Sequence, residues 1–509
     1  MPRRHRIPVA VLLLALAAAV GCRRAKPATD RPVSLGQQSE VVTLDPTFAD
    51  GSTFSALSNV FDGLVSYDGE MRLRPGLAAT WKTPDEKTWL LELRPDVLFH
   101  DGTKLLASDV VKALERARHD PDSEVQSKVW SIAEVTAPDD RTVKITTSKS
   151  NALLLHELTN VLIAKGATRQ EIEERPLGTG AYRVAGWERG AAVALEAFPQ
   201  HWNGAPPISR ITFVTSGEGD VAVQALERGK VDVTLVPART ILQRSNVSFT
   251  VRDSLGLSTQ YLYLNTLPSA GRKSPLTNRR VRQAMSLAVD RRKIARAATG
   301  HEETFAAQPV PKTVFGYAAN LPPPLFDPAR ARQLLAEAGY PAGFDIVLAH
   351  RRGVETEKLA GKLKEMLEAV GIRITLQPMR WPEMIDRMGG DDRPLDLFIG
   401  GWNFDTGDAG SFLRDCLRSR NLEERAGLFN WGYSNPEMDL LIDESTAAFN
   451  APSRLVRFEK VMKLAAEEVP LIPLYNEPDI WGVARDLAWK PRIDGRLLAA
   501  EMSLEPPPY

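Results

Sequence analysis

The chain is 509 residues long, 43% of its residues are hydrophobic, and 64 lysines and arginines stand against 64 aspartates and glutamates. A single hydrophobic core usually stops growing at about 250–300 residues, so this length predicts at least two lobes. The near balance of charge argues against a nucleic-acid partner, which requires a basic face. Beyond the N-terminal segment no apolar run approaches the length of a membrane span, so the body is predicted to be water-soluble.

The first 21 residues have the layout of a secretory signal peptide. Three arginines precede an apolar stretch, residues 9–20, that falls short of the ~20 residues a membrane-spanning helix needs. Small residues then lead to Cys22, and "AVGC" resembles the lipobox of bacterial lipoproteins. This resemblance implies cleavage before Cys22 and a lipid on its thiol. The alternative is an ordinary signal peptide with an incidental cysteine. The charged, proline-containing stretch 22–32 is predicted to be a tether between lipid anchor and domain.

The body alternates helical and strand patterns, which predicts an α/β fold. Strands are expected over 140–148 and 191–198, where polar and β-branched residues alternate. A helix is expected from a Ser-Asp cap in "SDVVKALERARH", and another between a capping Asp327 and a terminating Gly339. The stretch 357–378 is typical of an amphipathic helix followed by a strand, which is half of a βαβ unit. Cys416 is expected to pack in a core, because an acylated Cys22 leaves it without a disulfide partner.

Two extended apolar runs, 257–266 and 469–484, are candidates for the places where the chain crosses between lobes. A lobe inserted between two crossings would make a hinge of two parallel strands. The resulting predicted division is lobe I over 33–258 with an extra subdomain over about 57–177, lobe II over 259–480, and a C-terminal return to lobe I over 481–509.

Recognisable catalytic motifs are missing from the sequence. It has no GxSxG elbow, no HExxH, no GxxxxGK[ST] loop and no CxxC pair. The seven histidines are scattered without an i, i+4 pair, so neither a metal site nor a cofactor is predicted.

The most informative stretch is "PLDLFIGGWNFDTGDAGSF" (394–412), in which an apolar strand runs into two glycines, Trp402, Asp405 and Asp408. Ligands of α/β folds are held at the carboxyl ends of strands, and glycines let a ligand approach the backbone. A tryptophan beside a carboxylate suits a small molecule with an apolar body and a cationic end. The alternative is a turn in which Trp402 packs into the core and Asp405 caps the following helix.

The order of segments resembles the peptide-binding subgroup of ABC-importer solute-binding proteins, the family 5 receptors for oligopeptides, dipeptides and nickel. The resemblance runs from Leu44 to about Gly495 and rests on eight segments in register: "LDP" (44–46), "FDGLVSYDGEMRLRPGLAATW" (61–81), "TWLLELRPDVLFHDGTKLLASDVVKALER" (88–116), "PLGTGAYRVAGWERG" (176–190), "VQALERGKVDV" (223–233), "VRQAMSLAVDRRKI" (281–294), "ARQLLAEAGYP" (331–341) and "EEVPLIPLYN" (467–476). It implies a two-lobed periplasmic binding protein-like α/β fold with a hinge, of type II and cluster C-like, with ligand enclosed between the lobes.

The resemblance also implies site residues. In peptide receptors of this family the first Asp after the Gly-Trp motif pairs with the α-ammonium group of the ligand, and here that position is Asp405. Trp402, Asn403 and Phe404 beside it are the other predicted ligand-binding residues. Where the family has Asp-Pro, this chain has Asp408 followed by alanine. The region in which dipeptide receptors place an arginine offers only Lys358, so a dipeptide-specific pocket is not predicted.

The leading hypothesis is a lipid-anchored receptor that delivers peptides or related solutes to a separate permease with cytoplasmic ATPases. It is expected to be a monomer outside the cytoplasm, in the periplasm or at the cell surface, without enzymatic activity. A tethered extracytoplasmic hydrolase that uses Asp405 and Asp408, and a receptor that serves a sensor in place of a transporter, are the alternatives. The sequence leaves the identity of the ligand open.

Overall fold

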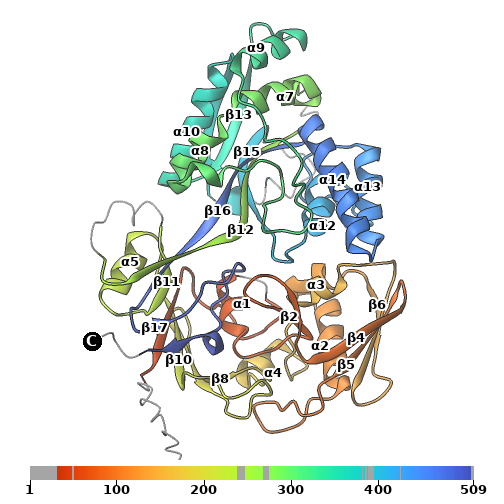
Figure 1. The fold of residues 1–509 in the computed structure, drawn as a ribbon, viewed down its shortest axis with the longest axis vertical. Coiled ribbons are helices and arrows are strands. Elements are labelled where there is room, and N and C mark those ends of the chain that lie inside the picture. Colours follow the sequence, from red (N-terminus) through yellow and green to blue (C-terminus); the bar gives the residue numbers. More distant parts are fainter. Residues whose placement is uncertain are drawn as a thin grey trace, which may run out of the picture.

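One mixed sheet runs through both lobes of the molecule (Figure 1). The computed structural model describes residues 31–48, 51–237, 247–267, 274–380, 382–384, 387, 395–424 and 426–505. Within these residues the sheet has ten strands in the order β14-β13-β15-β12-β16-β11-β1-β10-β9-β8. The predicted signal peptide, Cys22 and most of the predicted tether lie outside the described residues. The α/β class and the two-lobed architecture predicted from the sequence are confirmed.

Two long strands connect the lobes. Strands β12 (Thr250–Leu264) and β16 (Leu471–Val483) pair along most of their length and run from one lobe into the other (Figure 1). Their pairing is antiparallel, so the predicted hinge of two parallel strands is wrong. The reason is topological: the chain enters lobe II along β12 and returns along β16, and adjacent strands that run in opposite directions form an antiparallel ladder.

The ladder between these strands is irregular at the junction of the lobes. Its register shifts between Ser254 and Ser258, and Gly256 in this interval has φ of +60°. A Cβ on Gly256 would lie 2.2 Å from the carbonyl oxygen of Glu477 on β16. The left-handed conformation and the close approach both require glycine here. The bulge therefore interrupts the ladder of the two strands that connect the lobes.

Lobe I contains one end of the ten-stranded sheet, and segments from both ends of the chain meet in its core. Its strands are β1 (Val33–Gln37), β8 (Tyr182–Glu188), β9 (Ala192–Ala197), β10 (Arg210–Thr215) and β11 (Val233–Leu235), with helices α1 (Gly51–Leu57), α4 (Arg169–Glu174) and α5 (Asp220–Glu227). The C-terminal residues Leu497, Ala499 and Met502 are buried in the same core as Val33 and Leu35 of β1. The chain thus packs its tail, which carries η5 (Ala499–Glu501), β17 (Leu487–Ala488) and β18 (Ser503–Leu504), against its first strand.

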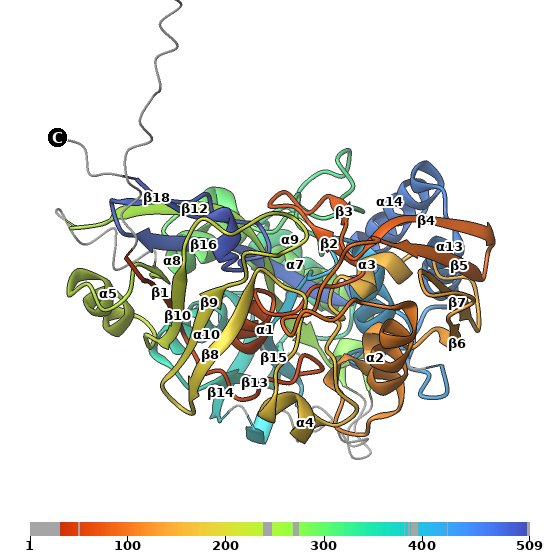
Figure 2. The ribbon, with the colours of Figure 1, turned by 90° about the horizontal axis from the view of Figure 1, so that it is seen from below.

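A four-stranded sheet forms a separate layer beside lobe I (Figure 2). Its strand order is β4-β5-β7-β6, and it has its own core with helices α2 and α3. The elements of this region, here called the lobe I subdomain, are β2 (Val65–Tyr67), β3 (Leu73–Pro75), β4 (Ala78–Asp85), β5 (Thr88–Leu93), α2 (Ala107–His119), η1 (Glu124–Lys128), β6 (Ile132–Thr136), β7 (Thr142–Thr147) and α3 (Leu154–Leu158). The predicted domain boundaries themselves remain predictions, and those at 258/259 and 480/481 fall inside β12 and β16.

Lobe II contains the other end of the sheet, covered by helices. The predicted half of a βαβ unit is completed by β13 (Phe344–Arg351), which leads into α10 (Val354–Glu368) and β14 (Ile372–Met379) and pairs with β14 in parallel. Strand β15 (Leu397–Asn403) lies between β13 and β12. The remaining elements are η2 (Pro275–Thr277), α7 (Arg279–Ala288), α8 (Arg291–Thr299), η3 (Glu302–Thr304), α9 (Pro328–Glu337), α12 (Ala409–Phe412), η4 (Leu413–Leu417), α13 (Pro436–Ala447) and α14 (Ala451–Glu468).

Helix ends show how far local sequence rules hold. Asp327 caps α9 as predicted, because its side chain accepts a hydrogen bond from the backbone N–H of Arg330. For α2 the predicted Ser-Asp cap is wrong: the helix begins at Ala107, and Asp109 in its first turn accepts from the N–H of Leu106. Cys416 is buried in a lobe II core as predicted, and burial raises the pKa of its thiol.

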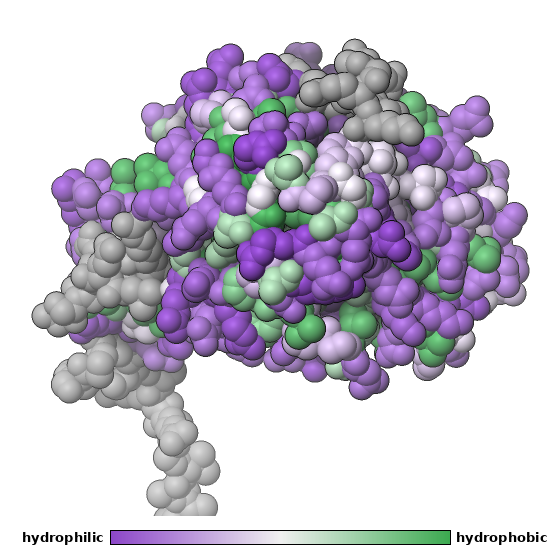
Figure 3. Space-filling view, turned by 90° about the horizontal axis from the view of Figure 1, so that it is seen from above, coloured by the Kyte–Doolittle hydropathy of each residue, from purple (hydrophilic) through white to green (hydrophobic). Residues whose placement is uncertain are grey.

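One face of the molecule is shown in Figure 3, and most of its residues are hydrophilic. On the face shown in Figure 3 the apolar residues form small areas separated by hydrophilic ones. Among the described residues, no helix combines the length and apolar character that crossing a membrane requires.

Candidate functional site

A pocket of about 360 Å³ lies at the carboxyl end of β15, a size within the usual range for small-molecule sites. Its described lining residues come from lobe II with one exception, a lysine of the lobe I subdomain. They are Lys128, Tyr263, Phe398, Gly400, Gly401, Trp402, Asn403, Asp405, Phe429 and Trp431. The position agrees with the rule that α/β folds bind ligands at the carboxyl ends of strands.

Aromatic rings form the walls of the pocket. Tyr263 and Phe398 stack nearly parallel with centroids 4.4 Å apart, and Trp431 lies 4.2 Å from Phe398. On the other side Trp402 makes an edge contact with Phe429 at 5.6 Å. Rings that already pack on one another are fixed in position, so they offer a ligand a rigid apolar surface.

An ion pair between the lobes closes one edge of the pocket. A carboxylate oxygen of Asp405 lies 2.5 Å from Nζ of Lys128, the last residue of η1. The side chains remain 36% and 20% exposed respectively, so solvent or a ligand can reach both. The two charges of the pocket edge therefore come from different lobes.

The loop that carries Asp405 is held by a second, buried ion pair. Asp408 accepts two hydrogen-bonded contacts from Arg454 of α14, at 2.9 and 2.8 Å, and both side chains are almost inaccessible to solvent. Asp408 also accepts a hydrogen bond from the N–H of Gly410 at 2.7 Å and is the N-cap of α12. The alternative interpretation named Asp405 as the cap of the following helix, but the cap is Asp408, and Asp405 lines the pocket. The turn is fixed without the proline that is usual in the family the sequence resembles.

Lobe I also contacts this loop through Tyr67. The hydroxyl of Tyr67 donates to the carbonyl oxygen of Thr406 and lies 2.7 Å from Nδ1 of His156. Burial raises the pKa of Tyr67 well above its usual value, with smaller contributions from the carboxylates of Asp408 and Asp405. Tyr67 thus remains a neutral hydrogen-bond donor at the junction of the lobes.

The structure separates the four predicted ligand-binding residues. Trp402, Asn403 and Asp405 line the pocket. Phe404 instead points into the core, where it is fully buried and packs 5.2 Å from Phe412. Phe404 follows the last residue of β15 and opens a turn, in which its carbonyl oxygen accepts a hydrogen bond from the N–H of Gly407, so the alternation of the strand no longer sets its direction. The predicted binding roles stay predictions for the three pocket residues.

Sequence reasoning missed much of the pocket. Tyr263, Phe429 and Trp431 lie far from the Gly-Trp motif along the chain, and Lys128 sits in a short 3₁₀ turn without any motif. The tyrosines of "QYLYLN" were a usable signal, because alternating aromatic residues on a strand next to a predicted site can reach the same face. Lys358, weighed for a ligand carboxylate, is instead on α10 and pairs with Glu355 at 3.2 Å.

Acidic side chains of β16 lie behind Gly401, one of the two glycines that line the pocket. Glu477 accepts a hydrogen bond from the amide of Gln260 at 3.2 Å, and Gln260 in turn lies against Gly401. Burial raises the pKa of Asp479 to about 7, and the charges of Glu477 and Asp494 add to the effect. The pKa of Glu477 is also raised by burial. This part of the junction between lobes is therefore sensitive to protonation.

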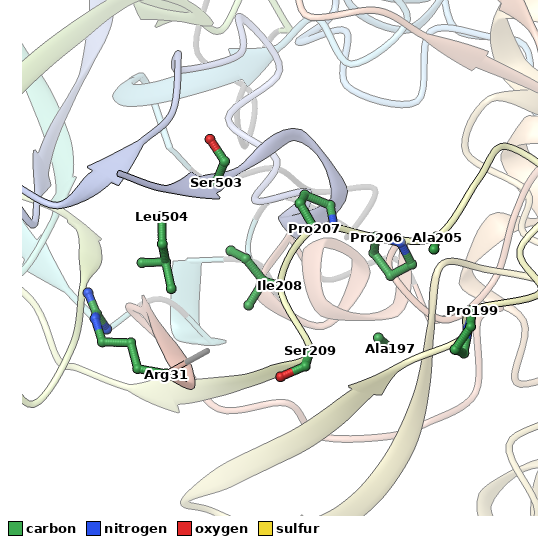
Figure 4. A pocket seen from close by; sticks show the side chains of 10 residues that line it. All are labelled: Arg31, Ala197, Pro199, Ala205, Pro206, Pro207, Ile208, Ser209, Ser503 and Leu504. Atoms are coloured by element: carbon green, nitrogen blue, oxygen red, sulfur yellow. The ribbon is translucent and has the colours of Figure 1, made fainter. Parts of the chain in front are cut away.

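A second hollow, of about 320 Å³, lies on lobe I away from this region (Figure 4). It is lined by Pro199, Pro206, Pro207 and other small or apolar side chains between the β9–β10 connection and the C-terminal strand. Its one charged group, Arg31, already pairs with Asp232 and Asp486. We favour the aromatic pocket as the functional site, because there an accessible ion pair stands beside aromatic walls at the carboxyl end of a strand.

The described residues also bear on metal binding and on acid–base catalysis. No cluster of three or more histidine, cysteine, aspartate or glutamate side chains suited to a metal occurs in the described part of the chain. A pair of carboxylates for acid–base catalysis is not provided by Asp405 and Asp408, because Asp408 is buried and committed to Arg454.

Comparison with known proteins identifies a family over most of the chain. Residues 72–423 match the family model described as bacterial extracellular solute-binding proteins, family 5 Middle. The glutathione-binding protein GsiB of Escherichia coli is 28% identical over 492 residues, which cover 93% of each chain. Heme-binding protein A of Haemophilus influenzae is 26% identical over 466 residues, covering 84% of this chain and 83% of the relative.

Solved structures share the fold. The periplasmic binding protein DppA from Helicobacter pylori, in complex with the peptide STSA, superposes with a TM-score of 0.78 at 21% sequence identity. The superposition covers 94% of this chain and 98% of the other.

Proposed function

Since the chain belongs to the bacterial extracellular solute-binding proteins of family 5, we propose that it captures a peptide or peptide-like solute in the pocket beside β15 and delivers it to an ABC import permease. The observation that carries this proposal is the accessible carboxylate of Asp405 at the edge of an aromatic pocket. A carboxylate in that place pairs with a ligand ammonium group, and the rings cover the apolar part of the same ligand.

The relatives support a ligand of this kind. One is named for binding glutathione, another for binding heme, and the structurally similar DppA holds a peptide. Glutathione and the peptide both carry an ammonium group, which matches the carboxylate of Asp405. We therefore place peptides and peptide-like compounds first among the candidate solutes.

The site lies where the lobes meet, so closure of the lobes completes it. Lys128 and Tyr67 reach the loop after β15 from lobe I, while the aromatic walls belong to lobe II. Ligand can shift such a molecule to its closed form only through contacts that the open form lacks. A contact between the ligand and Lys128 of lobe I would be such a contact, because the other described lining residues belong to lobe II.

The hydrolase alternative is not supported by the geometry, because Asp408 is paired inside the protein and Asp405 has no second carboxylate to work with at the pocket edge among the described residues. A role as receptor for a sensor uses the same pocket and differs only in the membrane partner. The relatives are binding proteins, and transport is the function that we propose.

We further propose that Cys22 carries a lipid and that the mature protein is a monomer tethered outside the cytoplasm. The support is the signal-peptide layout and the cysteine that follows it. A Cys22→Ser variant should lose the site of acylation and appear in the soluble exported fraction or remain unprocessed. Membrane association equal to that of the natural protein would refute the anchor.

The substitution Asp405→Asn tests the proposed binding site. The first step is to identify, by native mass spectrometry, the compound that copurifies with the protein. Asparagine keeps the shape of the side chain but removes its charge, and a ligand ammonium group enclosed between the closed lobes without a carboxylate partner costs roughly 3–5 kcal/mol. We expect affinity for the released compound to fall by about two to four powers of ten, with little change in the stability of the empty protein.

A matched control is Asp122→Asn, an exposed aspartate in the lobe I subdomain outside the pocket, which should bind normally. Titration with an N-acetylated form of the same compound adds a second check, because acetylation removes the ammonium charge. Equal affinity of the natural protein for free and acetylated forms would refute recognition of a ligand ammonium group by Asp405.

A further inference from the structure

The ion pair between Asp405 and Lys128 places two opposite charges side by side at the mouth of the pocket. The groups are 2.5 Å apart, they come from different lobes, and both line the same pocket. A ligand ammonium group that takes Asp405 must displace the Lys128 ammonium from it. The lysine then needs another anion, or a cation is left without a partner at the junction of the lobes.

The described carboxylates nearby are fixed inside the protein: Glu157, which feels the charge of Lys128, is buried and accepts hydrogen bonds from Trp130 and Asn151. Glu157 and Asp415 both pair with Arg414, at 3.3 and 2.9 Å. Asp408 is held by Arg454 in the buried pair described above. Since these three described carboxylates are held inside the protein, a carboxylate of a ligand in the pocket is the anion that can approach the exposed part of Lys128.

We propose that Lys128 is a specificity-determining residue that binds a carboxylate of the ligand, and that the preferred ligand carries this carboxylate on the same carbon as its ammonium group. Such an amino-acid head replaces one ion pair with two: its ammonium group pairs with Asp405 and its carboxylate with Lys128. A single tetrahedral carbon separates the two ligand charges, which suits protein groups that lie in direct contact. This inference rests on the proposed function of the pocket.

The proposal separates two kinds of peptide. In an ordinary peptide the carboxyl group next to the N-terminal ammonium is consumed by the peptide bond, so the head is lost. In a peptide linked through the side-chain carboxyl of an N-terminal glutamate, both head groups remain free. Glutathione has this γ-linkage, and the relative named for binding it matches over nearly the whole chain. The expected ligand class is thus γ-glutamyl peptides and related compounds with a free amino-acid head.

The test compares glutathione with its α-linked isomer, which has the same composition and net charge but lacks the free carboxylate on the ammonium-bearing carbon. Calorimetric titration under a reductant that keeps the thiol reduced should show that the protein binds glutathione at least about tenfold more tightly than the isomer. Lys128→Met should weaken glutathione binding by about tenfold or more, which corresponds to about 1.4 kcal/mol, and change isomer binding much less. Lys112→Met is the matched control, an exposed lysine on α2.

Each other outcome decides against the proposal. If Lys128→Met weakens both isomers equally, Lys128 only helps to hold the lobes together. If the natural protein binds both isomers equally, or binds neither, the amino-acid head is not what the site recognises. The proposed function fails separately, through unchanged binding of the copurified compound by the Asp405→Asn variant.

Discussion

Arg454 is predicted to be a main support of the loop that carries Asp405 and Asp408, and its replacement by methionine is a quantitative test. The side chain is 6% exposed, donates to both oxygens of Asp408, and donates through Nε to the carbonyl oxygen of Ser445 at 3.1 Å. Methionine fills much of the same space but leaves the Asp408 carboxylate, which is 1% exposed, without its cation. Breaking a buried pair in this way costs about 3–5 kcal/mol. We expect the free energy of unfolding of Arg454→Met to fall by that amount.

The pairwise interaction is isolated by combining Arg454→Met with Asp408→Asn. Asparagine is a good N-cap, so the hydrogen bond from Gly410 to position 408 should survive while the charge is removed. Urea denaturation of the natural protein, both single variants and the double variant should give a coupling energy of about 2 kcal/mol or more, with the double variant more stable than the sum of the single effects implies. Strictly additive effects would show that the pair contributes nothing and that the loop is held by other contacts.

Three further outcomes follow from the junction of the lobes. Burial beside Glu477 and Asp494 raises the pKa of Asp479 from 3.8 to about 7, so the folded state binds a proton more tightly than the unfolded chain. The free energy of unfolding should therefore fall as pH rises, by about 2 kcal/mol between pH 5.5 and 8. Urea melts of Asp479→Asn should lack this fall. If the variant keeps the same dependence of stability on pH, Asp479 is not the group responsible. Gly256→Ala should cost more than the ~1–2 kcal/mol of a left-handed residue, because its methyl group meets a backbone carbonyl. Gly102→Ala is the control, because φ is +83° there and nothing lies within 4 Å of the added methyl group, so only the cost of the left-handed conformation should appear. Equal losses of stability for the two variants in thermal melts would contradict a clash at Gly256. Small-angle scattering should show a smaller radius of gyration with saturating ligand, and identical curves would count against closure.

Much of the fold could be predicted because its signals are local. Asp327 and Gly339 bound a helix through capping chemistry within a few residues, and the helix-then-strand pattern over 357–378 reports directly on α10 and β14. The antiparallel pairing of β12 with β16 could not be predicted in the same way. These strands are separated by more than 200 residues, and their relative direction depends on how the chain passes through lobe II.

Prediction of the site shows the same limit. The Gly-Trp motif located one wall of the pocket, because β15 and the loop after it are a single continuous segment. It gave the wrong surroundings for Phe404, which lies just past the end of β15 in a turn and packs against Phe412 in the core. Lys128 had no signal in its own sequence. Lys128 and its partner Asp405 are 277 residues apart in the sequence. Such a pair leaves no periodic pattern in either segment, and only the assembled fold brings the two side chains together.

The division of the pocket between the lobes also explains how recognition can be coupled to closure. Lobe II supplies the aromatic walls and the carboxylate of Asp405, which a ligand can meet in the open molecule. Lobe I supplies Lys128, which contacts Asp405 across the junction and, in the proposed binding mode, would reach the ligand when the lobes close. A solute that satisfies only Asp405 competes with Lys128 and so removes one contact that holds the lobes closed. A solute that satisfies both groups replaces that contact with a bridge between the lobes. Differential affinity for the closed form is what drives a population shift, so the same lysine that selects the ligand would determine which ligands close the molecule.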